Sequence, residues 1–176
     1  MGNNLKTYIF MGAVTLISSL LLSYSYSSLK KLTKENIEFD IKRNIIKSVG
    51  YDITSMSKDD ININYDTNIT EMILDKNNEI LPGILWSDLV AVEDRKNGLT
   101  YFVNKVDKIK FNMVENKDTD TSIQSYLPIF FHNEKQVFII PISGKGLWST
   151  LFGFISIGKD GNTVQGIAFY KHKETP

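Results

Sequence analysis

The N-terminal end of the chain carries one long apolar run, "TYIFMGAVTLISSLLLSYSYSSL", over residues 7–29, without a charged residue. At a helical rise of about 1.5 Å per residue, this run spans about 30 Å, the thickness of a bilayer's hydrocarbon core. Tyr8, Tyr24 and Tyr26 lie toward its ends, where interfacial aromatic residues are common. We therefore predict a single transmembrane helix within a membrane anchor of residues 1–32. A cleaved signal peptide is the alternative, disfavoured because the N-terminal end is weakly basic and no small-x-small site closes the run.

The lysines around this run bear on its orientation. Lys6 precedes the run, whereas Lys30, Lys31 and Lys34 follow it. Because Lys and Arg are retained on the cytoplasmic side, this distribution alone would place the C-terminal part of the chain in the cytoplasm.

Residues 32–50, "LTKENIEFDIKRNIIKSVG", have the period of an amphipathic helix. Every fourth residue from position 37 is aliphatic, which gives one apolar stripe: Ile37, Ile41, Ile45 and Val49. Thr33 is the expected N-cap and Gly50 the expected stop. The alternative is a helix that continues directly from the membrane span.

The middle of the chain is less regular. Residues 55–68 are polar and rich in Asn and Asp, which is compatible with a short helix or a loop. "ITEMILD" (69–75) and "GLTYFVNK" (98–105) have the composition of strands. The charged, turn-rich segment 112–122 is expected to be a surface excursion.

The C-terminal part shows two hairpin patterns. "SYLPIFF" and "QVFIIPI" flank the polar turn "HNEK", and "LWSTLFGFISIG" and "TVQGIAFYKHK" flank "KDGN". Asp160-Gly161 between two apolar runs is a strong hairpin signal. We predict an α+β domain over residues 33–176, with an antiparallel sheet and flanking helices. Most of its aromatic residues are expected to lie in the sheet's core: Phe130, Phe131, Phe138, Trp148, Phe152, Phe154, Phe169 and Tyr170.

Composition excludes several classes of function. Twenty basic and twenty acidic residues leave no net charge, whereas a nucleic-acid-binding domain normally has a positive excess. The absence of cysteine excludes disulfides, thiolate metal sites and cysteine nucleophiles. His132 and His172 are far apart, and neither Asp59-Asp60 nor the 118–120 segment fits an EF-hand loop, so both acidic groups are interpreted as solvated turns. We predict no catalytic and no metal-binding residue in this chain.

The stretch "PISGKGLWST", residues 141–150, is the strongest candidate for a site. Gly144 and Gly146 would let a ligand approach the backbone, Lys145 could neutralise a phosphate, and Trp148 could lie against an aromatic ring system. The stretch matches neither a Walker A loop nor a G-x-G-x-x-G fingerprint. On these residues alone, a strand-connecting turn with a core tryptophan is the favoured interpretation.

A family resemblance changes that weighting. "ISGKGLWSTLFGFISI", followed by "DGNTVQGIAFYKHKETP", resembles the C subunit of the sodium-translocating NADH:quinone reductases. The resemblance extends in outline over residues 5–176 and is most specific from position 141 onward. The G subunit of Rnf-type electron-transport complexes shares the domain and is the nearest alternative. A non-enzymatic, membrane-anchored envelope module is a further one.

The resemblance implies an FMN-binding-type domain in which FMN is bound covalently, through its phosphate, to a threonine of an S-G-A-T motif. That motif lies beyond the E-T-P segment in the family and is absent from this sequence, so we expect a C-terminally truncated chain without an attachment residue. The residues that the resemblance places around the flavin are Ser143, Gly144, Lys145, Gly146, Leu147, Trp148, Ser149, Glu174 and Thr175.

The resemblance also implies a function. The chain would be an electron-transfer subunit of a translocase that passes electrons from NADH to ubiquinone and exports Na+, with no complete active site of its own. Its partners would be the other subunits and membrane lipid, not nucleic acid. The family places the soluble domain on the periplasmic side of the bacterial inner membrane, against the lysine distribution, and we follow the family here.

Overall fold

The computed structural model describes residues 2–94, 99–106 and 124–171. The chain divides into two compact units, Met1–Asp40 and Ile41–Pro176. The predicted excursion at 112–122, the acidic segment 118–120 and His172 lie outside the described residues.

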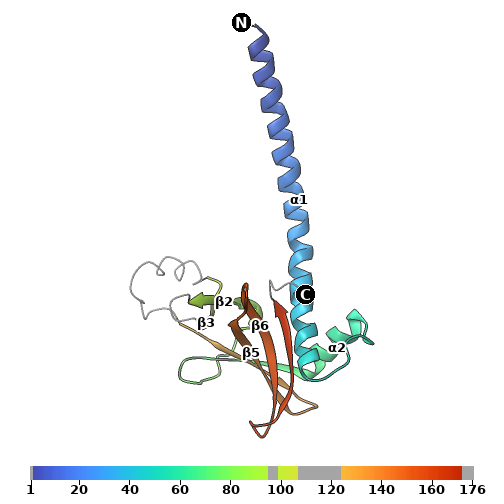
Figure 1. Cartoon of the computed structure of the whole chain (residues 1–176), viewed down its shortest axis with the longest axis vertical. Helices are drawn as coiled ribbons and strands as arrows, with labels where there is room; N and C mark the ends of the chain where they lie inside the picture. Colours follow the sequence, from blue (N-terminus) through green and yellow to red (C-terminus); the bar gives the residue numbers. More distant parts are fainter. Residues whose placement is uncertain (1, 95–98, 107–123, 172–176) are drawn as a thin grey trace. The chain divides into compact units, whose positions relative to one another are not determined.

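Helix α1, Gly2–Ser48, is one continuous helix that runs from the first unit into the second (Figure 1). It is long and apolar enough to cross a membrane. The expectation of an N-cap at Thr33 is wrong, because this hydroxyl donates to the Leu29 carbonyl within the helix, at 2.9 Å. No Gly or Pro lies between Gly12 and Gly50, so nothing interrupts the helix at that point.

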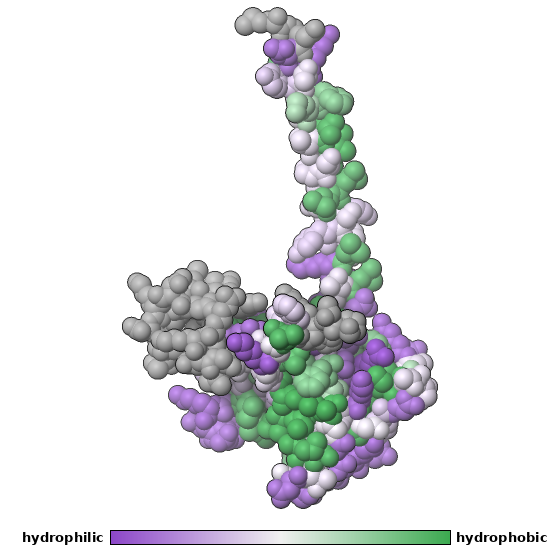
Figure 2. All heavy atoms as spheres, viewed as in Figure 1, coloured by the Kyte–Doolittle hydropathy of each residue, from purple (hydrophilic) through white to green (hydrophobic). Residues whose placement is uncertain are grey.

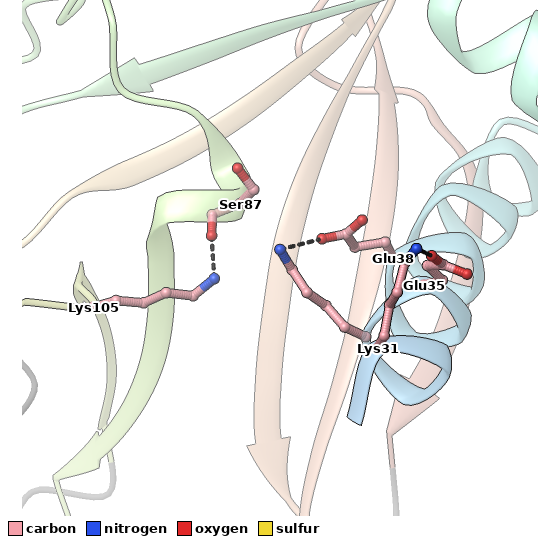
Figure 3. A network of polar contacts seen from close by, with 6 residues as sticks. Lys31, Glu35, Glu38, Ser87 and Lys105 are labelled. Atoms are coloured by element: carbon pink, nitrogen blue, oxygen red, sulfur yellow. Dashed lines mark hydrogen bonds and ion pairs between the residues drawn. The ribbon is translucent and has the colours of Figure 1, made fainter. Parts of the chain in front are cut away.

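Two exposed ion pairs follow the apolar run of α1. Lys31 and Glu35 approach within 3.9 Å, and Lys34 and Glu38 within 3.7 Å, each one turn apart (Figure 3). Such exposed pairs stabilise a helix by only about 0.3–0.5 kcal/mol each. They support the helix locally where its residues change from apolar to polar.

The end of α1 is where the sequence predicts it. Gly50 has φ +87°, and its N–H donates to the Lys47 carbonyl at 3.0 Å. A left-handed residue is tolerated best by glycine, which therefore stops the helix. The predicted stop is confirmed.

The ambiguous polar segment contains a helix, α2, Lys58–Asn68. The Ser57 hydroxyl accepts from the Asp60 N–H at 3.2 Å, and the Asp60 carboxylate accepts from the Ser57 N–H at 3.1 Å. This reciprocal capping box satisfies backbone donors that a helix N-terminus leaves free. The acidic pair Asp59-Asp60 thus lies in the first turn of a helix, not in a cation-binding loop.

The strands form two antiparallel sheets (Figure 1). The five-stranded sheet has the order β1-β4-β5-β6-β7. Its strands are β1 Ile69–Leu74, β4 Leu127–His132, β5 Val137–Lys145, β6 Thr150–Gly158 and β7 Val164–Lys171. The smaller sheet pairs β2 Leu89–Asp94 with β3 Leu99–Asn104, after the 3-10 helix η1 Trp86–Asp88. Both predicted hairpins, around "HNEK" and "KDGN", are confirmed.

A hydrogen bond joins η1 to the end of the smaller sheet. The Lys105 ammonium donates to the backbone carbonyl of Ser87 (Figure 3). The Lys105 backbone N–H also donates to the Asp88 carbonyl at 2.9 Å. These bonds hold η1, and with it Trp86, against the strand pair.

The core of the second unit lies between one face of the large sheet and the last turns of α1. Ile45 and Val49 of the predicted apolar stripe are buried there, and so is Ile46 beside them. The first member of the stripe, Ile37, is exposed in the first unit. Ile41 packs against this core from its edge. The sheet and α2 contribute Tyr65, Phe130, Val137, Ile139 and Phe154.

The opposite face of the sheet is also apolar. Phe131 and Phe138 are cross-strand neighbours with ring centroids 4.9 Å apart, and Ile155 lies opposite Ile167. These side chains are half-buried or exposed, as Phe169 is at 47%. In the view of Figure 2, a broad hydrophobic area covers part of the second unit. The expectation that Phe169 lies in the core is wrong, because strand alternation places it on this second face.

The last turn of α1 approaches the sheet unusually closely at Gly166. A Cβ atom on Gly166 would lie 2.5 Å from the Ser48 carbonyl oxygen. Next to this contact, the buried hydroxyls of Ser48 and Ser156 are 2.8 Å apart. Because the Ser48 hydroxyl donates to the Ile45 carbonyl at 2.7 Å, the Ser156 hydroxyl is the donor between them.

We predict that Gly166→Ala destabilises the fold by about 1–3 kcal/mol, since the added methyl overpacks the junction of α1 and β7. Gly144→Ala is the matched control, because a Cβ atom there meets no described atom within 4 Å. We expect the control to stay within about 0.5 kcal/mol of the parent chain. Urea unfolding of the detergent-solubilised chain, followed by circular dichroism, measures both. Equal midpoints for the two variants would contradict the assignment.

Candidate functional site

The candidate stretch forms the end of the β5–β6 hairpin. Ser143 lies opposite Phe152, and Lys145 lies opposite Thr150. The predicted loop over residues 141–150 is therefore shorter than expected, because its first half continues β5. Only residues 146–149 connect the strands, and the Gly146 N–H donates to the Ser149 carbonyl at 2.8 Å across this tip.

The tip presents apolar side chains to the outside. Leu147 is 83% exposed and Trp148 is 71% exposed. The favoured interpretation was a strand-connecting turn with a core tryptophan. The turn is confirmed, but Trp148 is not in the core, because the tip extends past the buried part of the hairpin. Large apolar side chains at this exposure are a surface that a ligand or partner can cover.

The backbone beside the tip is open. Gly144 lies in β5 opposite Leu151, is exposed, and has no described atom close to where a Cβ atom would stand. Its φ lies outside the left-handed region, which Gly50, Gly83 and Gly161 adopt. Gly144 is therefore not required by a turn, and its absent side chain leaves the strand surface accessible.

The structure thus brings the predicted residues 143–149 together at one hairpin end, as their adjacency in sequence requires. Glu174 and Thr175, the other two predicted flavin contacts, lie outside the described residues. Their approach to the hairpin stays a prediction.

Below the tip, the hairpin is anchored by tight packing. A Cβ atom on Gly153 would lie 2.5 Å from the Ala168 carbonyl oxygen and 2.8 Å from a ring carbon of Phe169. On the core face, Tyr170 stacks on Phe154 with ring centroids 5.1 Å apart, and its burial raises the pKa of the phenol to about 12. The exposed tip is thus supported by a rigid base.

The tryptophan that packs against the aromatic core is Trp86, which is half-buried. Its ring centroid is 5.3 Å from that of Phe102, 5.4 Å from that of Phe130 and 6.0 Å from that of Phe154. Sequence reasoning missed Trp86 because it lies in the short helix η1, outside any periodic apolar run.

Glu71 holds Trp86 in place. Its carboxylate accepts the Tyr65 hydroxyl at 2.7 Å and the Trp86 backbone N–H at 3.0 Å. Burial, followed by the negative charge of Glu71, raises the pKa of Tyr65, so this phenol stays a donor. The sequence signal for this role was the carboxylate of Glu71 inside the largely apolar strand "ITEMIL". The two satisfied donors make it a structural group.

Titratable side chains are dispersed in the described parts. Among residues 2–94, 99–106 and 124–171, no three His, Asp or Glu side chains come together as metal ligands. Hydrogen bonds from Ser57 lower the pKa of Asp60, and hydrogen bonds from Thr163 and Asn162 do the same for Asp160. Both carboxylates therefore act in local capping and turn formation.

The fold is shared with a solved protein. The crystal structure of the C subunit of Na+-translocating NADH-quinone reductase from Parabacteroides distasonis matches 84% of this chain and 60% of its own, with a TM-score of 0.56 at 22% identity. The predicted α+β class is therefore confirmed.

Sequence comparison leads to the same kind of protein. The chain is 28% identical to the C subunit of the Na+-translocating NADH-quinone reductase of Pseudomonas aeruginosa over 175 residues, 97% of this chain. It is 27% identical to the Pasteurella multocida protein of the same name over 93% of its length, and 48% identical to that of Vibrio alginolyticus over 44 residues. No family model matches. The similarity to the C subunit inferred from the C-terminal motifs is confirmed.

The chain spans less than two thirds of the length of the curated relatives that it matches. The aligned part covers 64% of the Pseudomonas aeruginosa protein and 61% of the Pasteurella multocida protein.

The two tryptophans test the packing of the site, in which Trp86 contacts the aromatic core and Trp148 lies at the exposed hairpin tip. We predict that Trp86→Ala destabilises the fold by more than about 2 kcal/mol, because it removes the half-buried ring that packs on Phe102, Phe130 and Phe154. Trp148→Ala should cost less than about 1 kcal/mol, since most of its ring is already exposed. Thermal unfolding of both variants by circular dichroism measures the difference. A larger loss for Trp148→Ala would show that the hairpin tip is part of the core.

Proposed function

We propose that the chain is the flavin-carrying electron-transfer subunit of a sodium-pumping NADH:quinone oxidoreductase, a translocase that passes electrons from NADH toward ubiquinone. The observation that supports this most is the similarity to the C subunits of Na+-translocating NADH-quinone reductases, which extends over nearly the whole chain. NADH oxidation, quinone reduction and Na+ movement are then functions of the assembled complex. No residue of this chain is assigned to them.

The residues at the hairpin end fit one side of an FMN site. Leu147 and Trp148 offer exposed apolar surface for the isoalloxazine, and Lys145 offers an exposed positive charge for the phosphate. Gly144 leaves the backbone open beside them. The FMN would supply one- and two-electron transfer, while these residues hold it and exclude water.

The proposal does not include a covalent bond between FMN and this chain. The family's attachment threonine belongs to an S-G-A-T motif, and the sequence contains no such motif. The proposal therefore concerns FMN held against the hairpin, with no threonine of this chain assigned as the attachment residue.

The proposed location is the bacterial inner membrane, with α1 as a single span and the second unit on the periplasmic side. Apolar side chains along α1, such as Leu20, Leu21 and Leu22, are more than half exposed in the chain alone. Lipid and the spans of other subunits are the environments that would cover such a surface. Both are the proposed partners of α1.

We predict that Gly146→Val and Trp148→Ala each reduce the FMN bound per subunit in the purified complex about tenfold, the effect of losing about 1.4 kcal/mol. The valine would block close approach at the tip, and the alanine would remove the largest apolar contact. Absorbance at the flavin band, relative to protein, measures the content.

The control is Val164→Ala, which trims another exposed apolar side chain, 58% exposed, at the start of β7 and away from the tip. It should keep the parent FMN content. Unchanged content in both tip variants would remove the hairpin from the site, whereas a flavin-free parent complex would end the proposal itself.

A further inference from the structure

The turn between β4 and β5 holds the end of α1 through a buried histidine. His132 is the last residue of β4, and none of its side chain is exposed. Its Nδ1 accepts the backbone N–H of Lys135 at 3.3 Å, so the proton of the neutral ring lies on Nε2. Among the described residues, none offers Nε2 a hydrogen-bond partner.

The residue that meets this ring follows directly after the helix stop. Tyr51 stacks on His132 with ring centroids 5.6 Å apart and planes 21° apart. The Lys135 ammonium lies 3.9 Å from the centroid of the Tyr51 ring and donates to the Val49 carbonyl at 3.2 Å. The turn thus fastens the end of α1 by a ring stack, a cation–π contact and a bond to a terminal helix carbonyl.

The charged groups around His132 come from the same turn. Lys135 donates its backbone N–H to Nδ1, and its side-chain charge also acts on the ring. Glu134 accepts the Tyr51 hydroxyl at 3.4 Å. Ile69 of β1 and Val137 of β5, which pair with His132, carry no charge. From the β6–β7 turn, the Lys159 ammonium reaches the Gln136 side chain at 3.4 Å, which adds a further positive charge near the turn.

These surroundings favour the neutral ring. Burial is the main reason why the pKa of His132 lies below its ordinary value, and the charge of Lys135 acts in the same direction, while Glu134 opposes it. A proton on Nδ1 would end its acceptance of the Lys135 N–H. It would also place a second positive charge beside the ammonium that binds Val49.

We propose that His132 is a proton-sensitive lock between the sheet and the end of α1, so that acid releases residues 49–51 while the sheet and the buried turn of α1 stay folded. The lock is independent of the proposed flavin, since it uses only the β4–β5 turn and the helix end.

The direction of the pH dependence follows from linkage. The locked state binds the proton more weakly than the released state, in which His132 regains an ordinary pKa near 6.5. The lock is therefore at full strength above that pH and weakens as the pH falls through it. One proton changes the ratio of locked to released molecules by at most about tenfold per pH unit.

Hydrogen exchange on the detergent-solubilised full chain, measured by mass spectrometry as protection factors between pH 7.5 and 5, tests the proposal. We expect protection of amides 49 and 50, which donate to the Ile46 and Lys47 carbonyls, to fall by up to about tenfold per pH unit below about 6.5. Amides of β5 and β6 should keep their protection. The use of protection factors removes the intrinsic pH dependence of exchange.

Two variants separate the lock from other effects of acid. His132→Asn keeps an acceptor for the Lys135 N–H without titrating in this range, and His132→Phe keeps the ring stack. Both should have protection at amides 49 and 50 that no longer depends on pH. The lock is refuted if the parent chain shows no fall, if the variants fall as the parent does, or if helix end and sheet lose protection together.

Discussion

The fold of the second unit depends on one contact, the close packing of the last turn of α1 against the sheet. Gly166 permits it, because the Ser48 carbonyl lies where a Cβ atom would stand. The same approach buries Ile45 and Ile46 completely and gives the buried Ser156 hydroxyl its partner, the hydroxyl of Ser48. Without this approach, the five-stranded sheet would lose the cover of one face.

This contact also explains where the hairpin end lies. The helix end, α2 and Trp86 cover the sheet around Phe130, Ile139 and Phe154. β5 and β6 continue beyond that covered region to Lys145 and Thr150, so their tip has no core to enter. A closely packed base thus carries an exposed apolar tip.

The β4–β5 turn holds the end of α1 within the second unit. α1 carries the apolar run at one end and the core residues at the other, in one uninterrupted helix. The contacts made by Tyr51 and Lys135 terminate this helix against the sheet.

Much of this could be predicted from the sequence, because the signals are local. The charge-free run, the stripe through Ile45 and Val49, the stop at Gly50 and the Asp160-Gly161 turn each depend on neighbours within a few residues. The motif from Ser143 to Ser149 likewise led to the right relatives. A local rule failed at Thr33, where a capping residue lies inside a helix that nothing interrupts.

Other properties depend on residues that are distant in the chain. The sequence contains two tryptophans, and only the packing shows that Trp86 packs against the core and Trp148 lies at the surface. Gly166 has the pattern of an ordinary strand residue until the Ser48 carbonyl is placed against it. The sequence by itself determined the elements, their turns and the family resemblance, since these follow from local periodicity and motifs. The tertiary structure decided which side chains are buried and which contacts hold α1, because burial depends on what the rest of the chain places opposite each residue.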